Sequence, residues 1–135
     1  MKALKARITN GLNHGSIVET CDNSGAKVVR IVSVKGNKGK TVRRRKPSCG
    51  VGDLVLVAVQ KGETEMRKQV VPAIIVRQKK EYRRKDGTRI KFADNAVVIL
   101  KDDKGNPKGT IFKGPIAKEV AERWPAIAKV ASIVV

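Results

Sequence analysis

The chain is short of aromatic residues and has a single histidine, and both shortages limit its chemistry. Its 135 residues include two Phe, one Tyr and one Trp, so the core must be built from Val, Ile, Leu and Ala. A platform that stacks single-stranded bases needs several aromatic rings, which this sequence does not supply. His14 lies in a stretch rich in Gly and Asn with no nucleophile beside it, which favours a surface role over catalysis.

Cysteine is also scarce. Cys21 and Cys49 have neither the spacing of a metal site nor a disulfide framework around them. In a reducing compartment we expect two buried thiols. A zinc site that uses both thiols and His14 is the alternative, but it lacks a fourth convincing ligand. We therefore predict no metal and no cofactor.

Long apolar runs and paired carboxylates are absent as well. No segment approaches the roughly 18 apolar residues of a membrane span, and residues 1–15 lack the apolar centre of a secretory signal. The sequence thus predicts a cytosolic, unprocessed protein without a membrane partner. The carboxylates lie scattered in turns and polar loops, and no acid/base pair is placed on a rigid strand or helix. We expect no enzyme.

The charge, in contrast, is strongly one-sided. The chain has 30 Lys and Arg against 12 Asp and Glu, a formal net charge of +18 at pH 7. Such an excess attracts polyanions. Nucleic acid is the leading partner class, with a membrane surface or an acidic protein as alternatives.

Short runs of branched residues, separated by turn clusters, predict a mainly β domain. No helix separates these runs, so a parallel α/β sheet is disfavoured, and a small closed barrel or a sandwich is favoured. We expect one domain over residues 1–135, with an N-terminal arm (1–15), a barrel (16–112) and a C-terminal helical region (113–135). The expected strands are residues 16–21, 27–34, 54–59, 70–77, 96–100 and 110–112. The run 54–59, LVLVAV, predicts a strand that is covered on both faces.

The C-terminal region carries the one convincing helical pattern. Gly114-Pro115 is a typical start, and three apolar residues spaced four apart form one stripe: Ile116, Val120 and Trp124. Glu119 and Arg123 are spaced as a surface ion pair on another face. Pro125 ends this helix, one further turn follows over 126–131, and the apolar tail 132–135 can dock on the body.

Two segments hold half of all the basic residues. A loop (residues 35–46) and a ribbon (residues 77–91) contain 15 of the 30 Lys and Arg in 27 residues. Asp86-Gly87, a strong hairpin signal, lies near the middle of the ribbon. We expect these segments to contact RNA phosphates and shape, with Arg43–Arg45, Arg83 and Arg84 as the best contacts because guanidinium groups match phosphate oxygens. The candidate RNA-binding residues are Lys35, Lys38, Lys40, Arg43, Arg44, Arg45, Lys46, Arg77, Lys79, Lys80, Tyr82, Arg83, Arg84, Lys85, Arg89 and Lys91.

Other polar and glycine positions are assigned to architecture. These turn residues are Gly25, Gly50, Gly52, Asp86, Gly87, Asp94 and Asn95. Asp94 and Asn95 precede a strand, where Asx side chains commonly accept hydrogen bonds from nearby backbone amides.

The order of these motifs resembles a known family. Residues 73–76 (AIIV), then Asp86-Gly87, Phe92, Asn95 and residues 98–99 are similar to the signature of the universal large-subunit ribosomal protein fourteen family. Further matches are DNSGA (22–26), GVGD (50–53), DNA (94–96), GNPKGT (105–110) and GPI (114–116). The arm 1–15 and the segment 63–69 are more similar to the archaeal and eukaryotic branch than to the bacterial one.

The resemblance implies a closed five-stranded β-barrel with a projecting ribbon and a small C-terminal helical region. It further implies a structural protein of the cytoplasmic ribosome that binds large-subunit ribosomal RNA and touches small-subunit RNA at intersubunit bridges. Neighbouring large-subunit proteins and an anti-association initiation factor are the implied protein partners. For the C-terminal partner contact our candidates are Lys118, Glu122, Arg123 and Trp124. The competing hypotheses are a basic regulator of messenger RNA and an enzyme that acts on nucleic acid.

Overall fold

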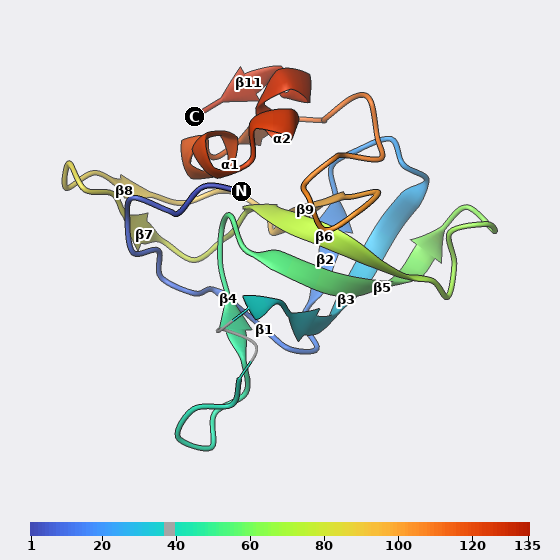
Figure 1. Ribbon diagram of the computed structural model, residues 1–135, viewed down its shortest axis with the longest axis horizontal. Helices are drawn as coiled ribbons and strands as arrows, with labels where there is room; N and C mark the ends of the chain where they lie inside the picture. The colour runs from blue at the N-terminus through green and yellow to red at the C-terminus, as the bar shows by residue number, and fades with distance from the viewer. Residues whose placement is uncertain (37–39) are drawn as a thin grey trace.

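A computed structural model describes residues 1–36 and 40–135, and its centre is a closed five-stranded barrel (Figure 1). Its strands, in spatial order, are β2 (Ile17–Thr20), β3 (Ala26–Val34), β5 (Leu54–Gly62), β6 (Val70–Arg77) and β9 (Ala96–Ile99). Neighbours pair antiparallel, except that β2 closes the barrel by pairing parallel with β9. The predicted fold class is therefore confirmed.

Strand β6 lies between the two hydrophobic clusters of the core and contributes side chains to both. Ala73 and Ile75 face the apolar residues inside the barrel, whereas Ile74 and Val76 belong to a second cluster under the C-terminal helices. Because side chains alternate along a strand, the unbroken apolar run AIIV is what burial on both faces requires. The sequence predicts such double coverage for residues 54–59, but the structure gives it only in part. There Val55 and its alternate neighbours are buried, whereas Leu54 and its alternate neighbours are only half-buried.

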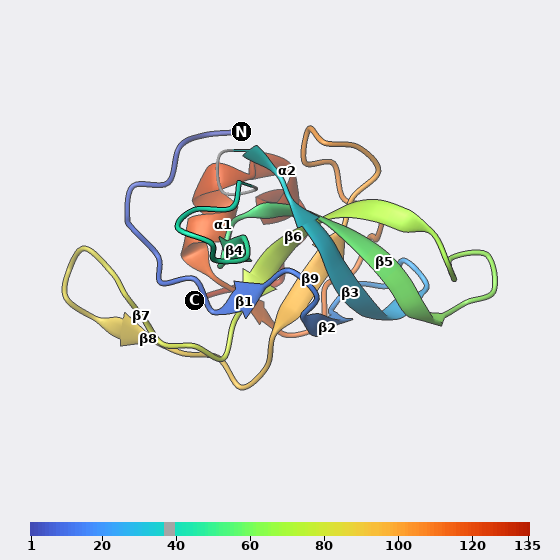
Figure 2. The same ribbon diagram turned by 90° about the horizontal axis from the view of Figure 1, so that it is seen from below.

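Two two-stranded pairs lie outside the barrel and carry the basic segments. The arm ends in β1 (Leu12–Asn13), which pairs with β4 (Ser48–Cys49) after the basic loop. The ribbon consists of β7 (Tyr82–Arg83) and β8 (Arg89–Ile90). In Figure 1 the loop before β4 and the ribbon project from the barrel in different directions, and Figure 2 shows the ribbon extended away from the barrel. The barrel thus acts as a base for two separate projections.

The C-terminal region corrects the sequence prediction in several details. The residues expected to open the helix form β10 (Pro115–Ile116) instead, and the helices are α1 (Lys118–Arg123) and α2 (Pro125–Val130). Pro125 ends α1 by opening α2, where the missing amide of its ring costs no helical hydrogen bond. The tail forms β11 (Ile133–Val134), which pairs parallel with β10. Residues 110–112, expected as a strand, contribute only an isolated bridge between Asp22 and Phe112.

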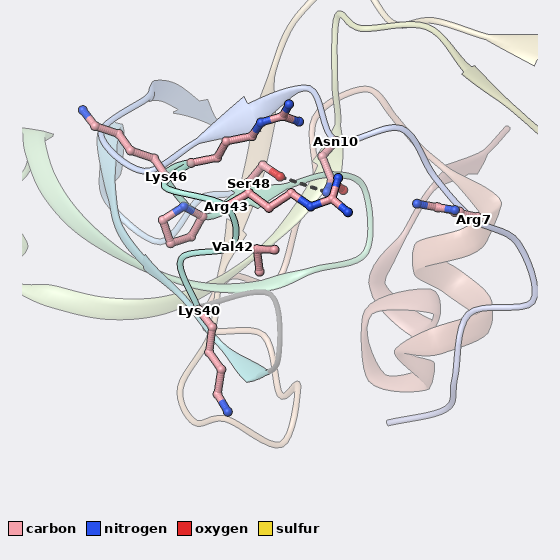
Figure 3. Close-up of a pocket in the computed structure, with 9 residues that line it drawn as sticks. Arg7, Asn10, Lys40, Val42, Arg43, Lys46 and Ser48 are labelled. Carbon is pink, nitrogen blue, oxygen red and sulfur yellow. Dashed lines mark hydrogen bonds between the residues drawn. The ribbon is translucent and has the colours of Figure 1, made fainter.

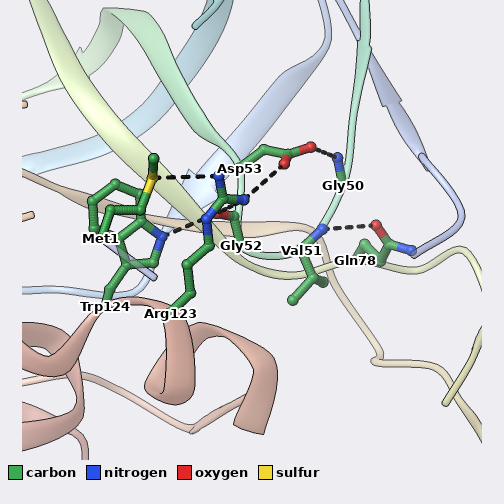
Figure 4. A network of polar contacts seen from close by, with 8 residues as sticks. All are labelled: Met1, Gly50, Val51, Gly52, Asp53, Gln78, Arg123 and Trp124. Carbon is green, nitrogen blue, oxygen red and sulfur yellow. Dashed lines mark hydrogen bonds and ion pairs between the residues drawn. The ribbon is translucent and has the colours of Figure 1, made fainter. Parts of the chain in front are cut away.

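Trp124 fastens the helices to the barrel. Its side chain is 1% exposed, and its Nε1 donates a hydrogen bond to the Gly52 carbonyl at 3.0 Å (Figure 4). The neighbouring Arg123 Nη1 donates to the same carbonyl at 3.1 Å and forms an ion pair with Asp53 at 3.4 Å. On the other side, a Cβ at Gly105 would lie 2.5 Å from the Trp124 ring, so this position has room only for glycine. These contacts of Arg123 and Trp124 hold the helical region against the barrel.

The described helices are all short. None of those in residues 1–36 and 40–135 has the length and apolar character needed to cross a membrane.

Candidate nucleic-acid interface

The ribbon is closed by a turn at the predicted place, but its central residues are Lys85 and Asp86, because the Gly87 amide donates to the Arg84 carbonyl at 3.0 Å. The Arg84 amide donates to the Thr88 carbonyl at 2.8 Å, and the Thr88 amide donates to Asp86 Oδ1 at 2.9 Å. Gly87 has φ +88°, a conformation that favours glycine. The hydrogen bond from Thr88 lowers the pKa of the Asp86 carboxyl group. Asp86 and Gly87 thus shape the tip, and the cations lie on either side of them.

Most of the candidate cations on the ribbon are exposed. These are Lys79, Lys80, Arg83, Lys85, Arg89 and Lys91. Arg89 Nη1 forms an ion pair with Glu81 at 2.6 Å, but both side chains are largely in solvent, so that pair restrains Arg89 only weakly. Because these side chains are exposed to solvent, they can meet an external anion.

Arg77, in contrast, is buried and donates hydrogen bonds within the protein. The residue is 8% exposed, and its Nε and Nη2 donate to the two carboxylate oxygens of Asp94 at 2.8 and 3.0 Å. Its Nη1 donates to the carbonyls of Lys113 and Pro115 at 2.9 and 2.8 Å. The guanidinium group thereby joins β6, the start of β9 and β10.

Asp94 and Asn95, which precede β9, accept hydrogen bonds from different kinds of donor. The sequence predicts that both accept from backbone amides. Asn95 does so, from the Lys79 amide at 2.8 Å, whereas Asp94 accepts from the Arg77 side chain. Asp94 therefore holds Arg77 in place, in addition to its position at a turn.

Arg84 and Tyr82 are internal as well, and both contact Glu119 of α1. Arg84 Nε donates to Glu119 Oε1 at 2.7 Å, and the Tyr82 hydroxyl donates to Oε2 at 3.0 Å. Arg84 Nη2 also donates to the Val135 carbonyl at 2.7 Å. Glu119 is 5% exposed, so the predicted surface pair between Glu119 and Arg123 is wrong: Glu119 points to the ribbon, and Arg123 points to Asp53.

This cluster shifts the pKa values of its members. Burial, together with the Glu119 carboxylate, raises the pKa of Tyr82 to about 12. Burial opposes the charge on Arg84, but its hydrogen bonds to Glu119 and Tyr82 outweigh burial and raise its pKa. The cluster holds β7 and the start of the ribbon turn against α1 and the C-terminal residue Val135.

The basic loop is exposed wherever the structure describes it. The exposed candidates are Lys35, Lys40, Arg43, Arg44, Arg45 and Lys46, whereas Lys38 lies outside the described residues. Lys35 Nζ lies 3.7 Å from Asp103 Oδ2, with both side chains exposed. Within residues 1–36 and 40–135, the other candidates on this loop form no ion pair with a carboxylate.

The tip of this loop is a tight turn with an unusual sequence. The Arg45 amide donates to the Val42 carbonyl at 3.0 Å, and the two central residues, Arg43 and Arg44, have φ +51° and +59°. Two positive φ values define the type I′ turn, for which Asn-Gly is the preferred sequence. A non-glycine residue in this conformation costs about 1–2 kcal/mol. The turn therefore carries strain of a few kcal/mol while holding two arginines at its tip.

A cavity of about 520 Å³ lies between this loop and the N-terminal arm (Figure 3). The cationic residues around it are Arg7, Lys40, Arg43, Arg45 and Lys46. Asn10 and Ser48, joined by a hydrogen bond of 3.0 Å, also line it. Arg7 and Asn10 were not among the predicted contacts, because nothing in the linear sequence shows that β1 pairs with β4 and brings the arm beside the loop.

The C-terminal candidates divide in the same way as the ribbon residues. Lys118 and Glu122 are exposed on α1, whereas Arg123 and Trp124 contact the barrel. Among the turn residues, Gly25 and Gly52 have φ +97° and +86°, and the Gly50 amide donates to Asp53 Oδ2 at 2.9 Å. These positions shape the backbone.

Both cysteines are buried thiols outside any disulfide, as expected. Burial raises the pKa of the Cys21 thiol to about 12. His14 is exposed. Within residues 1–36 and 40–135, no three His, Cys, Asp or Glu side chains lie together in a way that could hold a metal ion.

Comparison with known proteins identifies close relatives. The family model described as ribosomal protein L14p/L23e matches residues 11–135. The chain is 56% identical, over 100% of both chains, to the large ribosomal subunit protein uL14 of Nanoarchaeum equitans. It is 54% identical, over 99% of both chains, to the protein of that name from Methanococcus vannielii, and 52% identical, over 100% of both, to that from Halobacterium salinarum.

Proposed function

Because the chain belongs to the ribosomal protein L14p/L23e family, we propose that it binds large-subunit ribosomal RNA and helps to bridge the two ribosomal subunits. The family consists of structural ribosomal proteins rather than enzymes, and membership assigns the protein to the cytoplasmic ribosome, in the large subunit. Its archaeal relatives agree with the branch that the arm and residues 63–69 resemble.

One observation carries the RNA-binding proposal: the two short projections, residues 35–46 and 77–91, are the segments where exposed cations are densest. The net charge of +18 makes contact with phosphate favourable, and each phosphate neutralised releases counterions. Our revised contact set consists of Lys35, Lys40, Arg43, Arg44, Arg45, Lys46, Lys79, Lys80, Arg83, Lys85, Arg89 and Lys91. We leave out Arg77, Tyr82 and Arg84 because their side chains are engaged inside the protein. Lys38 lies outside the described residues, and its contact with RNA stays a prediction from the sequence.

Salt-dependent binding to transcribed large-subunit ribosomal RNA tests this proposal. In a Lys79→Ala/Arg83→Ala variant, the slope of log K against log salt should fall by about 0.7–0.9 for each phosphate that the variant no longer neutralises. A Lys27→Ala/Lys61→Ala variant removes the same charge from exposed barrel positions and is the matched control. Equal slopes in the two variants would contradict the assignment of contacts to the ribbon.

Two projections that leave the barrel in different directions also suit a bridge between two RNA surfaces. One would hold the parent subunit, and the other would reach small-subunit RNA. Separate crosslinks from the loop (35–46) and the ribbon (77–91) to ribosomal RNA test this point. If both segments crosslink only to large-subunit RNA in joined ribosomes, the bridging proposal fails.

For protein partners we propose the face formed by α1 and the C-terminal tail. Lys118 and Glu122 are exposed there, and Ile133 and Val134 expose 54% and 47% of their surface. Neighbouring large-subunit proteins and, by the resemblance, an anti-association initiation factor are the proposed partners. A Lys118→Glu/Glu122→Lys variant should release such a factor from free large subunits in a co-sedimentation assay. Unchanged co-sedimentation would contradict a role for these two side chains.

A basic regulator of messenger RNA is the competing function. Sedimentation of the native protein distinguishes the two. A protein that does not travel with large subunits through a moderate-salt gradient would refute the ribosomal proposal.

A further inference from the structure

The cavity between the basic loop and the N-terminal arm has the composition of an anion site. Its lining contributes five cationic side chains, and no Asp or Glu is among its lining residues in the described part of the chain. The Asn10–Ser48 pair adds polar atoms at one side. Guanidinium groups suit phosphate because their donors match two phosphate oxygens at once.

The arm that forms one wall is fixed on both sides of Arg7. Toward the N-terminus, the Lys2 amide donates to the Arg123 carbonyl at 3.0 Å. Toward the barrel, the Thr9 carbonyl accepts from Gln78 Nε2 at 2.8 Å, and β1 then pairs with β4. Arg7 is therefore held near the loop before any ligand arrives, which lowers the entropy cost of binding.

The opposite wall is the strained Val42–Arg45 turn. In Figure 3 the Arg43 side chain extends toward Asn10 on the arm. Asn-Gly would form the same turn without the strain that two consecutive positive φ values impose on Arg43 and Arg44. Backbone strain of this kind is concentrated at functional sites, and here the strained residues carry guanidinium groups beside a cavity lined by cations.

We propose that this cavity is a preformed site for backbone phosphate of ribosomal RNA, in which Arg7 and Arg43 grip the phosphate from opposite walls. The inference rests on the proposed RNA-binding function and adds to it the site, the ligand group and a contact from the arm. The strained turn serves to place Arg43 at the site, so that relief of the strain should stabilise the protein and weaken RNA binding.

A matched pair of variants tests the site. Arg43→Asn and Lys68→Asn each remove one positive charge and each place Asn, which tolerates positive φ, at a residue with φ +51° or +62°. Lys68 is exposed in the β5–β6 hairpin and does not line the cavity. Both variants should therefore have a raised thermal unfolding midpoint.

Binding to transcribed large-subunit ribosomal RNA should separate the two. Arg43→Asn should lower the affinity by about tenfold, since a charge-assisted hydrogen bond is removed, and should reduce the salt slope by about 0.7–0.9. Lys68→Asn should change the affinity by less than about twofold, as expected for an isolated exposed charge. Arg7→Ala should resemble Arg43→Asn in binding, although the two residues lie in different segments.

The outcomes separate this inference from the function on which it rests. If the unaltered protein does not bind the RNA, the proposed function fails. If it binds, and Arg7→Ala and Arg43→Asn behave as Lys68→Asn does, the function stands and the phosphate site is refuted. If Arg43→Asn binds normally and is less stable than the unaltered protein, the functional account of the strain is refuted too.

Discussion

Replacing Arg84 by Ala should destabilise this protein strongly, whereas replacing its neighbour Arg83 should not. The side chains of Arg84 and Glu119 are 10% and 6% exposed, and the Arg84–Glu119 ion pair is 2.7 Å long. Removing Arg84 would leave the Glu119 carboxylate buried, with the Tyr82 hydroxyl as its remaining side-chain donor among the described residues. Breaking one side of a buried ion pair costs about 3–5 kcal/mol.

That loss is large against the total stability of a domain, which is about 5–15 kcal/mol. With a urea dependence of about 2 kcal/mol per molar, a loss of about 4 kcal/mol lowers the unfolding midpoint by about 2 M. Far-UV circular dichroism during urea denaturation measures this shift. Arg83→Ala changes an exposed side chain and should stay within about 0.5 kcal/mol of the unaltered protein.

The same Arg84→Ala substitution in a Glu119→Gln protein tests whether the buried carboxylate causes the loss of stability. In Glu119→Gln protein no buried carboxylate is left behind, so Arg84→Ala should cost about 1–2 kcal/mol there. RNA binding supplies the opposite readout, because Arg83→Ala should weaken it and Arg84→Ala should not beyond the fraction unfolded. If Arg84→Ala cost less than about 1 kcal/mol and weakened RNA binding as Arg83→Ala does, the reasoning from the cluster would be refuted.

Three further predictions concern the packing of the C-terminal region and the buried titratable groups. Trp124→Ala should lower the free energy of unfolding by about 3–5 kcal/mol, and Trp124→Phe should lower it by about 1–2 kcal/mol because the Gly52 carbonyl loses its indole donor. Unfolding of both variants must be followed by circular dichroism, since Trp124 is the only Trp. A loss below about 1 kcal/mol for Trp124→Ala would mean that the helices do not hold Trp124 on the barrel. Tyr82 has a pKa raised from 10.0 to about 12, so its stabilising contribution is complete below about pH 10 and is lost as pH rises toward 12. Tyr82→Phe should therefore be less stable than the unaltered protein at neutral pH, with a difference that shrinks over that range, and a constant difference would refute the shift. Cys21 and Cys49 should both resist Ellman's reagent in the native state at mildly alkaline pH and react on unfolding, because both are buried and the pKa of Cys21 is raised to about 12; rapid labelling of either would show that it is accessible.

Much of the fold could be predicted because its signals are local. Runs of branched and apolar residues identified the five barrel strands to within a few residues, and Asp86-Gly87 identified the place of the ribbon turn, since each signal depends on neighbours in sequence. The first turn of the expected helix was wrong for a tertiary reason: residues 115–116 are extended because the tail pairs with them as β11. No local sequence pattern predicts that residues 133–134, near the end of the chain, pair parallel with residues 115–116.

The candidate site shows the same division. The sequence by itself determined the excess of positive charge, its concentration in two segments and the shortage of aromatic rings. Only the tertiary structure decided which cations face outward. Arg83 and Arg84 are adjacent and chemically identical, but Arg84 meets a carboxylate 35 residues further along the chain and Arg83 does not. Burial of a charge depends on what packs over it, and for Arg84 that is α1 and the C-terminal tail, whose positions are set by packing between residues far apart in sequence.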